Sequence, residues 1–197
     1  MKSTVNSKCF TVKRVLILFF LIVGVGSACA QKFGLKAGLN YSSISGDDYS
    51  YKPGFHAGIF LLINLSENIK LAPEVLYSAQ GAKFSSGQVD YNYINIPVLV
   101  NIYETKIIFL QLGAQLGIIT SANFSAGGSS SNVIASLNKT DFGLVGGLGA
   151  DFGMVVINAR YNWGLTEIVK SNPSAIVQKS DITTNTTIQI SIGIKIN

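Results

Sequence analysis

The sequence predicts an all-β fold, an up-and-down antiparallel transmembrane β-barrel of about eight strands. Three observations favour this fold. Apolar and polar side chains alternate in eight runs of about ten residues each, which is the period of a β-strand. Only 13% of the residues are charged and the mean hydropathy is +0.38, whereas a soluble domain is typically about 25% charged. Beyond residue 30, no apolar segment is long enough for a membrane-spanning helix.

Residues 1–30 are predicted to be a cleaved signal peptide, which leaves a barrel domain of residues 31–197. A basic segment precedes an apolar core, and Ala28-Cys29-Ala30 provides the small residues that signal peptidase requires. Two alternatives are weaker. A permanent membrane helix would need about 20 apolar residues without interruption by glycine. A lipoprotein acylated at Cys29 would carry a branched apolar residue where Gly26 stands.

The charge and cysteine content of the barrel domain follow from this division. Residues 1–30 hold four of the fifteen Lys and Arg residues, none of the ten acidic residues, and both cysteines, Cys9 and Cys29. The remainder carries a formal charge of +1, from eleven basic and ten acidic residues, so it has no basic excess for binding nucleic acid. Because it has no cysteine, its stability has to come from the fold and not from disulfides.

The first four predicted strands alternate between an apolar and a polar phase. Their apolar phases run from Phe33 to Tyr41, Phe55 to Ile63, Val75 to Ala79 within Leu71 to Ala82, and Ile94 to Ile102. The second strand is less regular than the others, because Phe60 and Leu62 occupy its polar phase. In the fourth strand, Pro97 cannot donate to the hydrogen-bond ladder, so a bulge or weak pairing is expected there.

The last four predicted strands are more regular. Their apolar phases run from Ile108 to Ile118, Phe142 to Leu148, Val155 to Trp163, and Ile188 to Ile196. The final strand is the clearest, because isoleucine alternates in it with Gln189, Ser191, Gly193 and Lys195. Eight is an even number of strands, as single-chain bacterial barrels require.

The predicted connections alternate in length. Short ones are expected at Leu65–Asn68, Tyr103–Lys106 and Phe152–Met154, and longer ones at Ser42–Pro53, Ser85–Asp90, Ser121–Thr140 and Thr166–Thr186. Membrane barrels have short turns on the periplasmic side and longer loops outside. A periplasmic N-terminus therefore places every longer loop outside the cell.

The polar phase distinguishes a membrane barrel from a soluble, lipocalin-like barrel. A phase that faced water would be about a quarter to a third charged, but Gly, Asn, Gln and Ser dominate it here. Small polar residues suit the narrow, filled interior of an eight-strand barrel. Aromatic residues near the ends of the runs are expected to form interfacial girdles. These residues are Phe33, Tyr41, Tyr77, Tyr91, Tyr93, Tyr103, Tyr161 and Trp163.

Six charged residues fall on the polar phases and are expected to form a charge network in the lumen. They are Lys36, Glu74, Asp141, Asp151, Arg160 and Lys195. An isolated charge in a narrow lumen is costly without a partner, so structural pairing is favoured over substrate binding. Glu74 and Arg160 are expected to pair, because they lie at similar heights on two strands that stand opposite each other in an eight-strand barrel.

Catalytic, cofactor and metal sites find little support in the sequence. His56 is the only histidine. Together with a serine and an acid it would suggest a lipid-modifying hydrolase, but no G-x-S-x-G motif is present. Gly143–Gly149 does not match the G-x-G-x-x-G nucleotide motif, and no helix pattern follows it. One histidine and scattered carboxylates do not make a metal site. The sequence thus predicts no catalytic residue, no cofactor and no metal.

Several segments resemble the PorT-type outer-membrane β-barrel family of Bacteroidetes. They are QKFGLKAGLN (residues 31–40), LAPEVLYSAQGAKF (71–84), YINIPVLVN (93–101), TDFGLVGGLGADFG (140–153) and NARYNWGLTEI (158–168). The resemblance spans nearly all of the barrel domain. It implies a location in the cell outer membrane and, for one member of the family, participation in protein secretion.

The expected function is that of a non-enzymatic outer-membrane protein with a structural or interaction role, in support of protein secretion or envelope assembly. Its expected partners are outer-membrane lipid and envelope or secretion proteins, with no nucleic acid. A small porin-like channel is the first alternative. The second is a lipid-modifying outer-membrane enzyme that uses His56.

Overall fold

The computed structural model describes residues 31–44, 50–84, 87–126, 129–132, 138–166 and 184–196. Within them it contains the strands β1 (Gln31–Ile44), β2 (Ser50–Asn64), β3 (Ile69–Phe84), β4 (Gly87–Tyr103), β5 (Ile108–Ala126), β6 (Ser129–Asn132), β7 (Thr140–Asp151), β8 (Val155–Gly164) and β9 (Asn185–Ile196). The predicted signal peptide, residues 1–30, lies outside the described residues. In the described part of the chain, no helix is long and apolar enough to cross a membrane.

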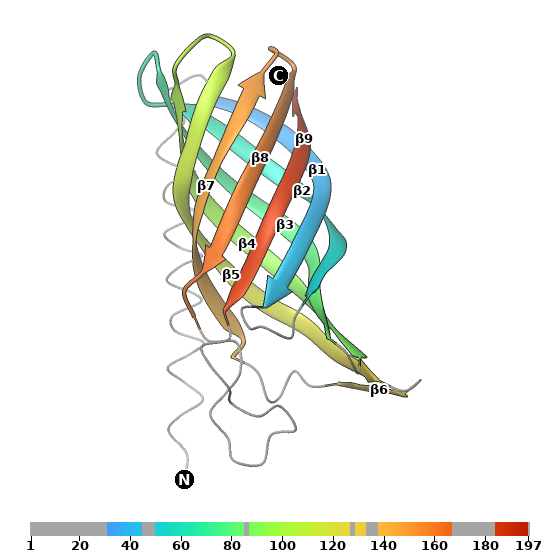
Figure 1. Ribbon diagram of the computed structural model, residues 1–197. Helices are drawn as coiled ribbons and strands as arrows, with labels where there is room; N and C mark the ends of the chain where they lie inside the picture. The colour runs from blue at the N-terminus through green and yellow to red at the C-terminus, as the bar shows by residue number, and fades with distance from the viewer. Residues whose placement is uncertain are drawn as a thin grey trace, which may run out of the picture. The chain divides into compact units, whose positions relative to one another are not determined.

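Eight of these strands form a closed antiparallel barrel (Figure 1). The sheet order is β4-β3-β2-β1-β9-β8-β7-β5, and pairing of β4 with β5 closes it. The first and last strands, β1 and β9, pair in register from Phe33 opposite Ile196 to Ile44 opposite Asn185. The short strand β6 adds to the far end of β5. The predicted up-and-down barrel of eight strands is confirmed.

The predicted inside and outside faces of the strands are also confirmed, except at the end of β2, where Ile63 is buried and Asn64 is exposed. In β9, the isoleucines from Ile188 to Ile196 are exposed on the outer surface, whereas Gln189, Ser191 and Lys195 are buried inside the barrel. The outer surface carries a band of exposed apolar side chains that includes Leu35, Leu39, Phe55, Ile59, Leu110, Leu112, Leu144, Leu148, Ile157 and Ile190. A soluble monomer rarely exposes an apolar surface of this extent to water.

Short turns join the strands at one end of the barrel. They comprise residues 65–68, 104–107 and 152–154. Side chains stabilise them locally: Ser66 Oγ accepts a hydrogen bond from the Ile69 N–H at 3.1 Å, and Asp151 Oδ1 accepts one from the Gly153 N–H at 3.0 Å. Gly153 has a φ of 83°, a left-handed conformation that favours glycine. These turns match the short connections expected on the periplasmic side, with the second displaced by one residue.

At the opposite end the strands run further than predicted. The connection expected at Ser85–Asp90 is reduced to two residues, because β3 continues to Phe84 and β4 begins at Gly87. Likewise β2 begins at Ser50, within the loop expected at Ser42–Pro53. The Ser- and Gly-rich composition predicted loops here, but the neighbouring strands provide ladder partners that hold these segments extended.

The longest of these projections involves β5. Beyond Ile118, which pairs with Thr140 of β7, β5 continues to Ala126 and pairs with β4 on one side and β6 on the other. We call the three paired segments 87–92, 119–126 and 129–132 the outer extension; Figure 1 shows β6 at its tip. The prediction that Ser121–Thr140 is a loop is therefore wrong for the part that forms this extension.

Pro97 weakens strand pairing on one side of β4 only. In the hydrogen-bond ladder between β3 and β4, two consecutive residue pairs are missing, and one of them is Glu74 opposite Pro97. On the other side, Pro97 lies opposite Gln115 without a shift in register. The expected weak pairing thus occurs between β3 and β4. The shift in register between β4 and β5 lies elsewhere, at Asn92 and Tyr93.

The aromatic girdles are smaller than predicted. Phe33, Tyr41, Tyr77, Tyr161 and Trp163 are exposed on the outer surface, as expected. In contrast Tyr91, Tyr93 and Tyr103 are buried on the inward face of β4. Strand alternation explains this correction, because all three share the inward phase of β4 with Asn95 and Asn101.

Towards the short turns, apolar side chains fill the lumen. One cluster contains Phe60, Leu62, Ala72, Leu99 and Val145, and another contains Tyr103, Phe109 and Val156. The Phe60 ring fits because Gly34 lies across from it: a Cβ there would stand 2.3 Å from Phe60 Cζ. The irregular phase of the second predicted strand therefore marks a real feature, the point at which the lumen becomes apolar.

Candidate functional site

A charge triad crosses the lumen. Glu74 on β3 accepts hydrogen bonds from Arg160 Nη1 on β8, at 2.9 Å from Oε2, and from Lys36 Nζ on β1 through Oε1. The three side chains are at most 3% exposed. Arg160 Nε also donates to Gln189 Oε1 at 2.8 Å. The Glu74–Arg160 pair expected from the sequence is therefore present, and Lys36 is a third member that the strand positions did not reveal.

A second ionic cluster lies next to the short turns. Asp151 at the end of β7 accepts a hydrogen bond from Lys195 Nζ, and its Oδ2 accepts one from the Tyr103 hydroxyl at 2.9 Å. Lys70 Nζ lies 3.8 Å from the same carboxylate and 4.0 Å from the centroid of the Tyr103 ring. Lys195 and Asp151 belong to the predicted network. Sequence reasoning missed Lys70, which lies beside a strand start, and assigned Tyr103 to the wrong face.

Asp141, the sixth predicted residue, belongs to neither cluster. It lies near the beginning of β7, whereas Asp151 lies at its end. One of its carboxylate oxygens, Oδ1, is buried without a hydrogen-bond partner. The six charges thus form two separate clusters and not a single network, and Asp141 belongs to neither cluster but is hydrogen-bonded to Asn185.

A hydrogen-bonded network of uncharged groups lies on the outer side of the triad, with Asn40 at its centre. Asn40 Nδ2 donates to the carbonyl oxygens of Phe55, at 2.9 Å, and Ala79, at 3.0 Å. Because its amide nitrogen is held by these carbonyls, its Oδ1 faces His56 Nδ1 at 2.7 Å and accepts from Gln189 Nε2 at 2.9 Å. Sequence reasoning placed Asn40 inside the barrel but did not identify this role.

His56 completes an arrangement that resembles a catalytic triad. Its Nε2 lies 2.9 Å from Ser191 Oγ, and its Nδ1 contacts Asn40 Oδ1, so a serine, a histidine and an orienting amide are aligned. A substrate would have to reach Ser191, yet all three residues are at most 1% exposed. Gly38 provides the space for the imidazole, since a Cβ there would stand 2.7 Å from His56 Cε1. The arrangement is suited to tying β1, β2 and β9 together.

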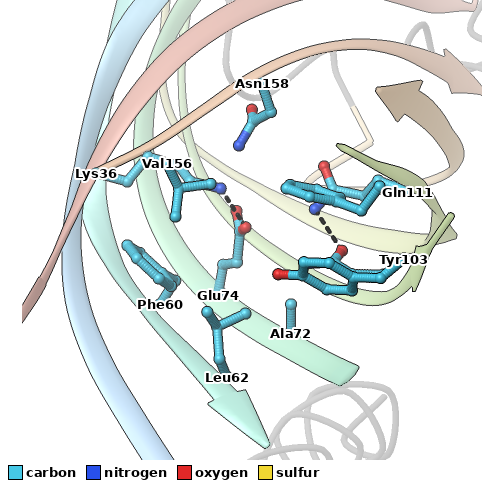
Figure 2. A pocket seen from close by; sticks show the side chains of 11 residues that line it. Lys36, Phe60, Leu62, Ala72, Glu74, Tyr103, Gln111, Val156 and Asn158 are labelled. Carbon is cyan, nitrogen blue, oxygen red and sulfur yellow. Dashed lines mark hydrogen bonds and ion pairs between the residues drawn. The ribbon is translucent and has the colours of Figure 1, made fainter. Parts of the chain in front are cut away.

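A small cavity lies between the triad and the apolar end of the lumen. Lys36, Glu74, Gln111, Tyr103 and Asn158 are among the residues that line it (Figure 2). It has room for about one water molecule. Gln111 Nε2 donates to Asn101 Oδ1 at 2.8 Å beside it. No group of three or more metal-ligating side chains occurs in the described ranges.

Two solved structures show which known proteins have a similar fold. Neisserial surface protein A (NspA) is 18% identical, with a TM-score of 0.58 over 83% of this chain and 97% of that chain. Ail, the attachment invasion locus protein of Yersinia pestis, is also 18% identical, with a TM-score of 0.51 over 84% of this chain and 99% of that one. At this identity the similarity concerns the fold alone. No curated protein matches the chain.

Family membership rests on a longer match. The family described as outer membrane protein beta-barrel domain matches residues 29–170, which is well over half of the sequence. The closed eight-strand barrel and its apolar outer band agree with that description. The chain is therefore an outer-membrane protein and belongs to the outer membrane protein beta-barrel domain family.

Proposed function

We propose that this is a non-enzymatic outer-membrane protein with a structural or interaction role, which supports protein secretion or envelope assembly. The filled lumen is the observation that supports the proposal most strongly. The charge triad and the apolar clusters occupy the interior of a barrel that is only wide enough to be filled by side chains. The segments that resemble the PorT-type family of Bacteroidetes support secretion as the process.

Because the interior is filled, we expect partners to bind on the outer surfaces of the barrel. The apolar band is proposed to contact outer-membrane lipid, and the outer extension to contact envelope or secretion proteins. The extension is suited to this because β4, β5 and β6 continue as a paired sheet beyond the last position at which β5 pairs with β7. Rigid projecting strands present a binding surface at a lower entropic cost than a flexible loop of the same length.

Shortening the outer extension tests the interaction role. Residues 121–137 would be replaced by a short Gly-Ser turn, which the adjacent positions Ile118 and Thr140 allow because they are directly paired. The shortened barrel should fold, shown by its resistance to heat in detergent gels, but should lose envelope proteins that cross-link to the full chain in native membranes. An unchanged set of cross-linked proteins would contradict a role for the extension.

Conductance measurements distinguish this proposal from the alternative of a porin-like channel. The purified barrel in planar bilayers should show no stable conductance steps, because the triad and the apolar clusters leave room for about one water molecule between them. A neutral variant, Gly146→Ala on the outer face of β7, is a suitable control for preparation effects. Reproducible unitary conductance in both proteins would favour the channel.

Site-directed labelling tests the orientation. Lys83 on β3 and Glu104 in a short turn are both exposed, at opposite ends of the barrel. In intact cells, a membrane-impermeant maleimide should label Lys83→Cys, and it should label Glu104→Cys only after the outer membrane is permeabilised. The barrel domain contains no cysteine that would interfere. The opposite labelling pattern would show that the short turns lie outside.

A further inference from the structure

The small cavity beside the charge triad brings open space and unpartnered polar groups together. Gln111 of β5 and Asn158 of β8 both line it, although their residues are only 1% and 2% exposed. Among the described residues, Gln111 Oε1 and both amide atoms of Asn158 have no hydrogen-bond partner. Figure 2 shows the two side chains at the rim of the cavity. Because a buried polar group without a partner costs free energy, the cavity is a candidate binding site.

The strand between the two amides offers neither of them a side chain. β7 lies between β5 and β8, and its residue opposite Gln111 is Gly147. Its residue opposite Asn158 is Gly149. The space directly over Gly149 is filled, since a Cβ there would stand 2.2 Å from Phe109 Cζ. The open space therefore does not continue along β7 at this position, and whatever bonds to the two amides has to lie in the cavity.

The unpartnered atoms require a group that can both donate and accept. Gln111 Nε2 donates to Asn101 Oδ1 at 2.8 Å, which leaves Oε1 as the atom that needs a donor. Both amide atoms of Asn158 are unpartnered, so either orientation of this amide offers a bond. Gln111 Oε1 and Asn158 Nδ2 are an acceptor and a donor that do not bond to each other directly. A single bridging group with both capacities would satisfy them.

Charge and size identify the bridging group as water. The Lys36 ammonium and the Glu74 carboxylate both line the cavity and are paired with each other. The ammonium would repel a cation and the carboxylate would repel an anion. A neutral molecule avoids both costs, and the cavity has room for about one water molecule. Buried waters typically bond to polar groups of this kind that have no protein partner.

We propose that the cavity binds one ordered water molecule, which donates to Gln111 Oε1 and bonds to the Asn158 amide. The water then connects β5 to β8 across the glycines of β7, where no side chain makes this connection. It is a fixed component of the lumen, located between the charge triad and the apolar cluster of Tyr103, Phe109 and Val156. This inference goes beyond the proposed function and does not depend on it, because it concerns the interior of the barrel and not its surfaces.

A crystal structure of the unsubstituted protein, at a resolution that shows ordered water, tests the proposal directly. We expect one density peak in the cavity, about 2.7–3.2 Å from Gln111 Oε1 and from one amide atom of Asn158. A well-ordered cavity without density would overturn the proposal. A direct hydrogen bond between Gln111 and Asn158 would also overturn it, because the two amides would then need no bridge.

A pair of variants tests what holds the water. Asn158→Leu removes both amide atoms and keeps a side chain of similar size. Thr187→Val is the matched control, because Thr187 is also a buried inward polar residue but lies outside the residues that line the cavity. The water should be lost in Asn158→Leu and kept in Thr187→Val. A water that remains at Gln111 in Asn158→Leu would show that Asn158 does not hold it, and would overturn the proposed bridge.

A measurement in solution excludes an effect of the crystal. Oxygen-17 relaxation dispersion counts the water molecules that a protein holds for long times. In detergent micelles, this count should fall by about one from the unsubstituted barrel to Asn158→Leu and should not change in Thr187→Val. An equal count in all three proteins would contradict the proposal, whatever the outcome of the cross-linking and conductance experiments.

Discussion

Replacement of Glu74 by glutamine should lower the free energy of unfolding of the refolded barrel by about 3–5 kcal/mol, since it leaves two buried cations without a counter-charge. Lys36 and Arg160 both bond to this one carboxylate, and neither can turn to solvent at an exposure of 3% or less. Urea unfolding in detergent measures the effect. Trp163, the only tryptophan, lies on the outer surface and reports loss of the apolar environment by fluorescence.

The triad also predicts the order of effects among its members. Lys36→Met and Arg160→Met should each cost less than Glu74→Gln, because Glu74 keeps one cation in either case. The triple variant Lys36→Met, Glu74→Gln, Arg160→Met should recover part of the stability that Glu74→Gln loses, because no uncompensated charge remains. Equal losses for the three single variants, with strict additivity in the triple variant, would show that the charges do not act as a unit.

Substitution of Gly38 by alanine should destabilise the barrel by at least about 2–3 kcal/mol, because the added methyl group has no space. A Cβ at this position would stand 2.1 Å from the Ile190 carbonyl oxygen and 2.8 Å from Ser191 Cα, both backbone atoms of the paired strand β9. Relief would require β1 and β9 to separate at a point where they close the barrel. The fraction of protein that refolds to a heat-resistant form should fall together with its resistance to urea.

Gly146 provides the matched control for this change. It faces outward on β7, and a Cβ there would meet only Leu112 Cδ2, at an ordinary contact distance of 3.8 Å. Gly146→Ala should therefore change stability little, since both variants add the same methyl group within a strand. If Gly146→Ala proves as damaging as Gly38→Ala, loss of glycine itself, and not the close approach of β9, is responsible.

Strand alternation allowed the barrel and its two faces to be predicted from the sequence. A slip of one residue would reverse every side chain in a strand, so each regular run fixes its own orientation. In β9, and from Val155 to Trp163 in β8, the alternation is regular enough to define a single outward face. Where composition was used in place of alternation, the predictions were wrong: Tyr91, Tyr93 and Tyr103 were assigned to girdles against the phase of their own strand.

The outer hairpins could not be predicted, because their strand structure depends on neighbouring strands and not on local pattern. Segment 119–126 is rich in Ser, Ala and Asn and has no strict alternation, yet β4 and β6 pair with it on both sides. Nothing in the sequence of this segment identifies its partner strands. Propensity for β-structure is strongly dependent on such context.

Part of the charge arrangement could be predicted from the positions of the charged residues along their strands. Strand starts give approximate heights, which sufficed to pair Glu74 with Arg160. The participation of Lys36, and of Lys70 and Tyr103 at Asp151, depends on the tilt of strands and on the reach of long side chains across the lumen. These quantities are set by the closed barrel as a whole and are absent from any single strand.

The pairing of β1 with β9 has a consequence for the kinetics of folding. Every residue pair between β1 and β9 joins positions that lie more than a hundred residues apart in the chain. Bringing the two strands together therefore costs loop-closure entropy before any contact between them offsets that cost. The seam cannot form until the last strand has been synthesised and exported. Until then β1 and β8 are open edges, able to pair with other chains. The C-terminal strand therefore determines both when the barrel closes and how long the exported chain remains vulnerable to aggregation.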